Sequence, residues 1–192
     1  MLLLGVLAAQ AEAAAPAAAG SYDLLATEIL TGSQASVTFS SLNSTYGSTY
    51  QHLQIRATFR SNRSASTGGA GIRFNSDSGT NYTRHWLEGD GSTVESSAVT
   101  STDLTDLGAY TATTATANAF AASVVDILDP FETTKYTTIR RLNGYAANVY
   151  NIALGSGLWM NTAALTDIEI FDRFSTFVTG SRFSLYGLKK AA

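Results

Sequence analysis

The sequence predicts an all-β protein: an antiparallel β-sandwich, jelly-roll-like, preceded by an extended apolar N-terminal arm. One reason is the alternation of apolar and polar residues over residues 51–60, the period of a half-buried strand. Its apolar positions are Leu53, Ile55, Ala57 and Phe59. Similar stretches recur about every 10 to 15 residues between turns rich in Ser, Thr, Asn and Gly, a rhythm typical of sandwiches and barrels. A third reason is that no segment carries a convincing helical period.

The predicted strands begin after the arm. Tyr22–Leu30 and Ala35–Phe39 are strands joined by the turn Thr31–Ser33, and we expect them to form a hairpin. Residues 40–49 are rich in Ser, Asn and Gly, so they are expected to form a loop that leads into the strand 51–60.

Turn-rich and apolar stretches continue to alternate beyond residue 60. Residues 61–71 are a Ser/Gly turn region. Residues 93–118 are mostly Ser, Thr and Ala and form either a long loop or weak edge strands. Pro130 marks a strand end, because proline cannot donate to a β-ladder. The sequence thus offers about ten strands, of which eight would fill a jelly roll; those after residue 60 are 71–75, 82–88, 120–128, 136–142, 149–159, 165–171 and 182–188.

Residues 1–20 are predicted to be an N-terminal arm with an Ala-rich linker, and residues 21–192 one sandwich domain. The arm imitates the apolar part of a secretory signal, but no Lys or Arg precedes Arg56, so the basic start of such a signal is missing. Its apolar run is also shorter than the roughly 20 residues that cross a bilayer, which argues against a membrane protein. We expect the arm to bind another subunit or, alternatively, to form the domain's own first strand. The candidate partner-binding residues are Leu2, Leu3, Leu4, Val6 and Leu7.

Composition excludes several functions. Charged residues make up 14% of the chain and the formal net charge is -3, which lacks the basic field that nucleic-acid binding requires. The absence of cysteine excludes disulfides, thiolate catalysis and cysteine-based zinc sites. A sandwich without disulfides takes its stability from its core or from neighbours in an assembly.

The sequence contains no convincing catalytic, cofactor-binding or metal-binding constellation. The chain has two histidines, His52 and His85, and both fall in predicted strands, where a structural role is the simpler interpretation. Carboxylates that are close in sequence, such as Asp167 and Glu169, lie at strand ends without a marked cleft, so a glycosidase is not favoured. Residues 75–81 imitate a calcium loop but lack its acidic last ligand, so a hairpin turn with Asx hydrogen bonds is preferred.

Two aromatic residues are candidates for facing a ligand. Tyr82 and Trp86 lie on one predicted strand and could stack on a sugar, although aromatic residues of a sandwich more often belong to its core.

Several stretches together resemble a widespread group of virion proteins of tailed bacteriophages. The resemblance covers roughly residues 34–190 in unbroken order, and the arm is the least matched part. It implies a jelly-roll-type sandwich with a structural role in the virion and no catalytic residue. The stretches are Val37–Ser41, His52–Arg56, Ile72–Tyr82, Leu87–Ser92, Ser156–Ala163 and Phe183–Leu188.

We therefore expect a non-enzymatic virion structural protein, located on the outer surface of the head or on the tail. The first hypothesis is a capsid decoration (cement) or head-fibre subunit, a homo-oligomer with a trimer favoured, which binds the major capsid protein through its arm and stabilises the shell. Lys189 and Lys190 would pair with an acidic partner surface or remain solvated. The alternative is a tail-associated fibre or receptor module that binds a host glycan through Tyr82, Trp86 or the loop 61–70. A weaker third hypothesis is a secreted enzyme or carbohydrate-binding domain.

Overall fold

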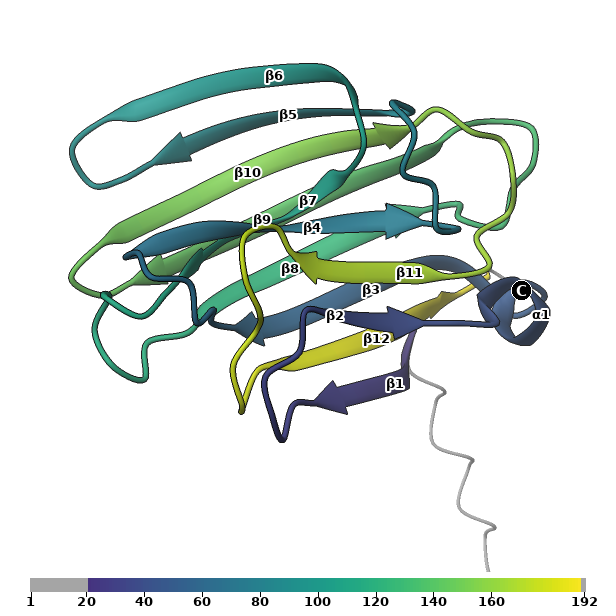
Figure 1. Ribbon diagram of the computed structural model, residues 1–192. Helices are drawn as coiled ribbons and strands as arrows, with labels where there is room; N and C mark the ends of the chain where they lie inside the picture. Colours follow the sequence, from purple (N-terminus) through teal and green to yellow (C-terminus); the bar gives the residue numbers. More distant parts are fainter. Residues whose placement is uncertain (1–20, 191–192) are drawn as a thin grey trace, which may run out of the picture.

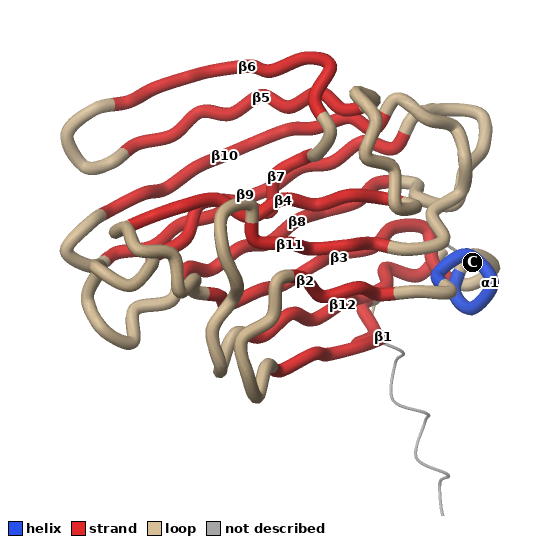
Figure 2. The backbone as a smooth tube through the Cα atoms, viewed as in Figure 1, coloured by secondary structure: helices blue, strands red, loops and turns tan. Residues whose placement is uncertain are grey.

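The alternating stretches fold into two antiparallel β-sheets packed face to face, so the predicted β-sandwich is confirmed (Figure 1). The structure is a computed structural model that describes residues 21–190. This part of the chain holds one short helix, α1 (Leu42–Tyr46), which lies at one end of the sandwich (Figure 2). The strands are β1 (Tyr22–Ile29), β2 (Ser36–Phe39), β3 (Tyr50–Phe59), β4 (Thr67–Phe74), β5 (Tyr82–Gly89), β6 (Val94–Thr102), β7 (Thr105–Thr111), β8 (Ala121–Leu128), β9 (Thr137–Ala146), β10 (Tyr150–Trp159), β11 (Ile168–Asp172) and β12 (Arg182–Lys189).

The two sheets are unequal in size. The larger sheet has eight strands in the order β1-β12-β3-β8-β9-β10-β5-β6, and the smaller has four in the order β2-β11-β4-β7. The smaller sheet covers one face of the larger one, with β7 packed across β8, β9 and β10. The opposite face of the larger sheet has no described strand over it.

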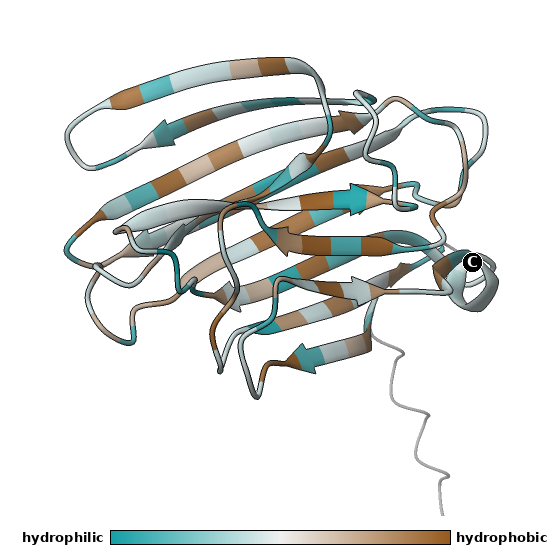
Figure 3. Ribbon diagram, in the orientation of Figure 1, coloured by the Kyte–Doolittle hydropathy of each residue, from teal (hydrophilic) through white to brown (hydrophobic). Residues whose placement is uncertain are grey.

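The core lies between the sheets and is built from the inward-facing residues of each alternating strand. In β3, Leu53, Ile55 and Phe59 are buried while Arg56 points outward, as the alternation predicted. The alternation along the strands can be followed as coloured bands in Figure 3. Phe59 packs against three further rings with centroid separations of 6.0 to 6.2 Å; they belong to Tyr110, Phe177 and Phe183. Aromatic rings of both sheets thus meet at the centre of the core.

The first predicted hairpin is wrong, because β1 and β2 belong to different sheets. β1 pairs with β12, and β2 pairs with β11. The backbone between them bonds to the segment before β12 rather than to itself: Leu30 N–H donates to Ser181 at 2.9 Å, and Gln34 N–H donates to Phe177 at 3.1 Å. With these bonds the chain crosses from the larger sheet, which contains β1, to the smaller sheet, which contains β2. The hairpin predicted around the turn 75–81 is also wrong, because β4 and β5 lie in different sheets.

Within residues 93–118, two edge strands form up to residue 111, which is the second of the two predicted alternatives, and residues 112–118 are a loop. β6 is an edge of the larger sheet and β7 an edge of the smaller one. The free edge of β7 is covered by a side chain of β9: Asn143 accepts from the N–H of Ala109 at 3.0 Å and donates to its carbonyl at 3.0 Å. The Asn143 amide therefore acts as a one-residue strand partner. Residues 40–49, predicted as a loop, contain the helix α1.

Candidate interaction surface

The open face of the eight-stranded sheet carries an unusual concentration of apolar side chains. Strands β8, β9 and β10 place apolar residues on both faces, so that Val125 enters the core while its neighbour Val124 points outward. We call the outward group the outer apolar surface. Its side chains are 37% to 76% exposed and belong to Leu87, Val94, Val124, Leu142, Tyr150, Ile152 and Leu154.

Strand register arranges these side chains in rows that run across the sheet. Residues that are paired across neighbouring strands share a face and lie close together. The first row crosses β8, β9, β10 and β5 through Val124, Leu142, Leu154 and Leu87. The second row continues to β6 and consists of Ala122, Gly144, Ile152, Gly89 and Val94. Because each row continues across at least four neighbouring strands, these residues form one continuous surface and are not scattered.

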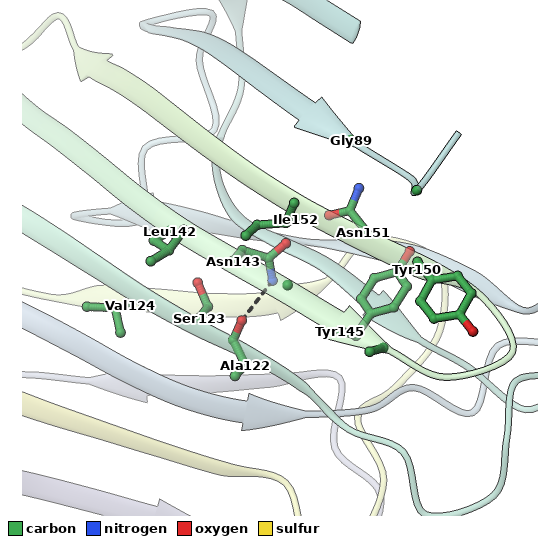
Figure 4. A pocket seen from close by; sticks show the side chains of 13 residues that line it. Gly89, Ala122, Ser123, Val124, Leu142, Asn143, Tyr145, Tyr150, Asn151 and Ile152 are labelled. Atoms are coloured by element: carbon green, nitrogen blue, oxygen red, sulfur yellow. Dashed lines mark hydrogen bonds between the residues drawn. The ribbon is translucent and has the colours of Figure 1, made fainter. Parts of the chain in front are cut away.

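Small residues in the second row leave a shallow hollow of about 570 Å³ (Figure 4). Ala122 and Gly144 lie opposite one another in the β8–β9 pair, where no large side chain fills the space. Figure 4 shows Leu142 on one side of the hollow and the rings of Tyr145 and Tyr150 on the other. The lining is predominantly apolar, so the hollow suits an apolar group rather than an ion.

Polar residues border the outer apolar surface along one side. The next row contains Asp126, Arg140, Ser156 and His85. The Arg140 guanidinium donates to the Asp126 carboxylate at 2.9 Å. Burial opposes ionisation of Asp126, but hydrogen bonds from Gln54 and Arg140 outweigh it and hold the pKa of this carboxyl below its usual value. The charged pair therefore stays ionised at neutral pH at the rim of the surface.

No protein-family model and no curated protein matches this chain. The single described helix, α1, is too short to span a membrane.

Tyr82 does not face a ligand, contrary to the sequence-based hypothesis. It is 0% exposed, and its hydroxyl accepts the N–H of Phe74 at 3.0 Å and donates to the carbonyl of Asp77 at 3.1 Å. Burial raises the pKa of this phenol above its ordinary value. Its ring stacks on Trp159 inside the core. Tyr82 is thus a core residue, the interpretation that is more common for aromatic residues in a sandwich.

Trp86 is half-buried on the side of β5 that faces the smaller sheet. Its indole N–H donates to Glu88 at 3.2 Å, and the Arg84 guanidinium lies 5.4 Å from the ring centre. Since Tyr82 is buried, the two candidate aromatic residues form no joint platform. Trp86 retains some accessible ring surface and remains a candidate for ligand contact.

The other sequence candidates have structural roles. His52 accepts the N–H of Asp129 at 3.0 Å, which closes the end of β8. Asp77, in the calcium-like stretch, accepts the N–H of Gly79 at 2.9 Å and the indole N–H of Trp159 at 2.8 Å, so its oxygens serve an Asx turn. Within residues 21–190 there is no group of three or more potential metal ligands.

The predicted arm residues Leu2, Leu3, Leu4, Val6 and Leu7 lie outside the described residues. At the other end of the chain, Lys189 pairs with Asp23 at 3.0 Å and Lys190 donates to the carbonyl of Gly47 at 3.0 Å. Both lysines thus have partners within the domain.

Sequence reasoning missed the outer apolar surface, although a signal was present. A half-exposed strand alternates strictly, whereas β8 contains the consecutive pair Val124–Val125 and β10 places Ile152 and Leu154 between small inward residues. Such breaks in alternation indicate strands that are apolar on both faces.

Proposed function

We propose that this chain is a non-enzymatic structural subunit of a bacteriophage virion, a capsid decoration (cement) or head-fibre protein that binds the assembled shell and stabilises it. Its partner would be the major capsid protein or another virion protein, and the subunits would form homo-oligomers. A ligand that binds only the assembled state stabilises that state by mass action, so each bound subunit would oppose opening of the shell.

The observation that carries this proposal is the outer apolar surface on a sandwich of low charge, a feature suited to contact between the subunits of an assembly. The largest apolar patch on a soluble protein is often a functional contact site, and the outer apolar surface holds most of the large exposed apolar side chains of the described chain. The two rows of this surface consist of apolar and glycine residues, so they are suited to contact with another protein.

The stretches that resemble tailed-phage virion proteins add support because they build the fold. Asp77, from the stretch Ile72–Tyr82, binds the indole of Trp159, from the stretch Ser156–Ala163. Asn75, also from the first stretch, donates to the carbonyl of Ala164 at 2.9 Å. These stretches therefore hold the sandwich together, which is consistent with a role as a structural subunit.

The test is the copy number of this chain in purified particles, with heads and tails separated and measured by quantitative mass spectrometry. Hundreds of copies on heads are expected. Absence of the chain from both fractions would overturn the proposal. Deletion of residues 1–10 is expected to abolish incorporation into particles while the purified domain stays folded; unchanged occupancy would defeat the role of the arm.

A tail-associated fibre or receptor module is the second candidate, favoured by the half-buried Trp86 with the Arg84 guanidinium beside its ring. The accessible part of the Trp86 ring could stack on a sugar, while the Arg84 guanidinium is already paired with Asp106. In that case the chain would be found on tails in a few to a few dozen copies, and Trp86→Ala would lose binding on a glycan array. Retention of all glycan signals by Trp86→Ala would eliminate this use of the residue.

A further inference from the structure

We propose that the outer apolar surface is a two-fold contact with a second copy of this chain, in which the open faces of two eight-stranded sheets pack against each other. This inference does not depend on the proposed function, because it concerns the isolated protein.

The first argument is the concentration of exposed apolar groups. Of the twelve large hydrophobic side chains that are exposed within residues 21–190, seven belong to the outer apolar surface. Of the other five, Tyr22, Leu24 and Ile29 lie on β1, at the far edge of the same sheet, and the remaining two are Tyr136 and Phe174. One surface therefore dominates the exposed apolar area of the domain.

The second argument is the size of the surface. If a fully exposed large side chain offers roughly 100 Å² of apolar area, the seven side chains offer about 400 Å² per copy. A standard protein interface buries about 800 Å² on each partner, of which about 450 Å² is non-polar. The outer apolar surface alone thus supplies most of the apolar area that a stable dimer needs.

The third argument is self-complementarity, which distinguishes a second copy from other partners. In a two-fold contact the same patch must supply both the projection and the recess. Here the hollow over Ala122 and Gly144 lies directly beside Ile152, which is 64% exposed and pairs with Gly144. Rotation about a two-fold axis places the Ile152 of each copy over the hollow of the other. Two sheets that pack in this way lie about 10 Å apart, which leaves room for one layer of interdigitating side chains.

The fourth argument is charge. The two apolar rows contain no ionisable residue, so two copies meet there without repulsion between like charges. Charged groups are confined to the rim, where Asp126 and Arg140 pair with each other and Arg56 is paired with Val124 across β3 and β8. A neutral centre with a polar rim is the usual composition of a protein interface. This geometry gives a dimer, in contrast to the trimer expected from the sequence.

The experiment measures the mass of the full chain in solution by sedimentation velocity and light scattering over the micromolar range. The parent chain is expected to be a dimer. Leu142→Asp and Ile152→Asp each place a carboxylate in the contact and are expected to weaken dimerisation at least about 100-fold, giving monomers. Either variant suffices if the other does not fold, as judged by circular dichroism.

The matched control is Leu24→Asp, at a residue that is 58% exposed on β1, at the far edge of the same sheet. It is expected to leave the dimer intact. A monomeric parent chain, a trimer, or folded Leu142→Asp and Ile152→Asp variants that still dimerise would each overturn the proposal. Deletion of residues 1–10 is expected to leave the dimer intact. If the deletion variant were monomeric, the arm and not a second sheet would be the group that binds the outer apolar surface, and the two-fold contact would be overturned. Failed particle incorporation by a dimeric chain would bear on the proposed function alone.

Discussion

A single buried arginine holds the long connection between β7 and β8, and its replacement is expected to destabilise the protein strongly. Arg60 follows the end of β3 and is only 8% exposed. Its guanidinium donates four hydrogen bonds to backbone carbonyls of the connection, with lengths of 2.6 to 3.2 Å; the acceptors are Ala112, Ala115, Thr116 and Ala119. Arg60→Met keeps the aliphatic part of the side chain and removes the guanidinium with all four bonds.

The expected loss follows from what each carbonyl retains. Three of the four keep another donor, but the carbonyl of Ala115 has only Arg60 as a hydrogen-bond donor within the described chain. Four bonds at about 1 kcal/mol net each give about 4 kcal/mol. The Ala115 carbonyl, left without a donor, increases the loss by about 1 kcal/mol. Removal of the buried Arg60 charge decreases the loss by a similar amount, because that charge no longer has to be desolvated. The free energy of unfolding should therefore fall by about 4 kcal/mol, a large share of the usual total.

Urea unfolding followed by tryptophan fluorescence measures this change. With an m-value of about 2 kcal/mol/M, the midpoint of Arg60→Met should lie about 2 M below that of the parent chain. The control is Arg140→Met, at an arginine whose side chain is 72% exposed and whose surface ion pair contributes less than about 1 kcal/mol. A decrease below about 0.5 M for Arg60→Met would refute the reasoning, because the four bonds would then contribute almost nothing.

Two further predictions concern the core and the response to acid. Gly68→Ala places a methyl group against the buried ring of Tyr110 and is expected to lower the free energy of unfolding by about 2 kcal/mol. The control is the adjacent Gly69, where an added methyl group would lie 3.7 Å from its nearest neighbour. Gly69→Ala should therefore be nearly neutral in the same urea assay. Burial of Asp77 opposes ionisation, but its hydrogen bonds, the strongest from Trp159, outweigh burial and lower the pKa of this carboxyl. The ionised Asp77 therefore stabilises the folded protein above the unfolded pKa of about 3.9. This stabilisation is lost as the pH falls through the folded pKa. Urea midpoints measured from pH 6 to pH 3 should therefore fall less for Asp77→Asn than for the parent chain; equal decreases would contradict this role.

The strands were predictable because their signal is local. Period-2 alternation in β3 needs only the one-dimensional pattern of residues 51–60, and burial of Leu53 and Ile55 follows directly from it. The turn after β5 also has a local cause, since the Asp90 carboxylate accepts the N–H groups of Ser92 and Thr93.

The pairing of strands was less predictable because it depends on residues far apart in the chain. β1 and β2 are separated by a good turn, yet each finds its partner more than a hundred residues later, in β12 and β11. The outer apolar surface was missed for the same reason: Val124, Leu142 and Leu87 form one row only after three separate pairings have been set. The burial of Tyr82 likewise depends on a ring, Trp159, from another strand.

The placement of β1 beside β12 determines how the domain responds to mechanical force. Tyr22 pairs with Leu188, and the N–H of Lys189 donates to the carbonyl of Ser21 at 3.1 Å, so both ends of the described chain leave from the same corner. A force that pulls these ends apart would act perpendicular to the β1–β12 strands and break their hydrogen bonds one after another. It would not load all of the bonds at once, as a shearing force does. A load applied through both ends of the described chain would therefore meet the resistance of only a few hydrogen bonds at a time.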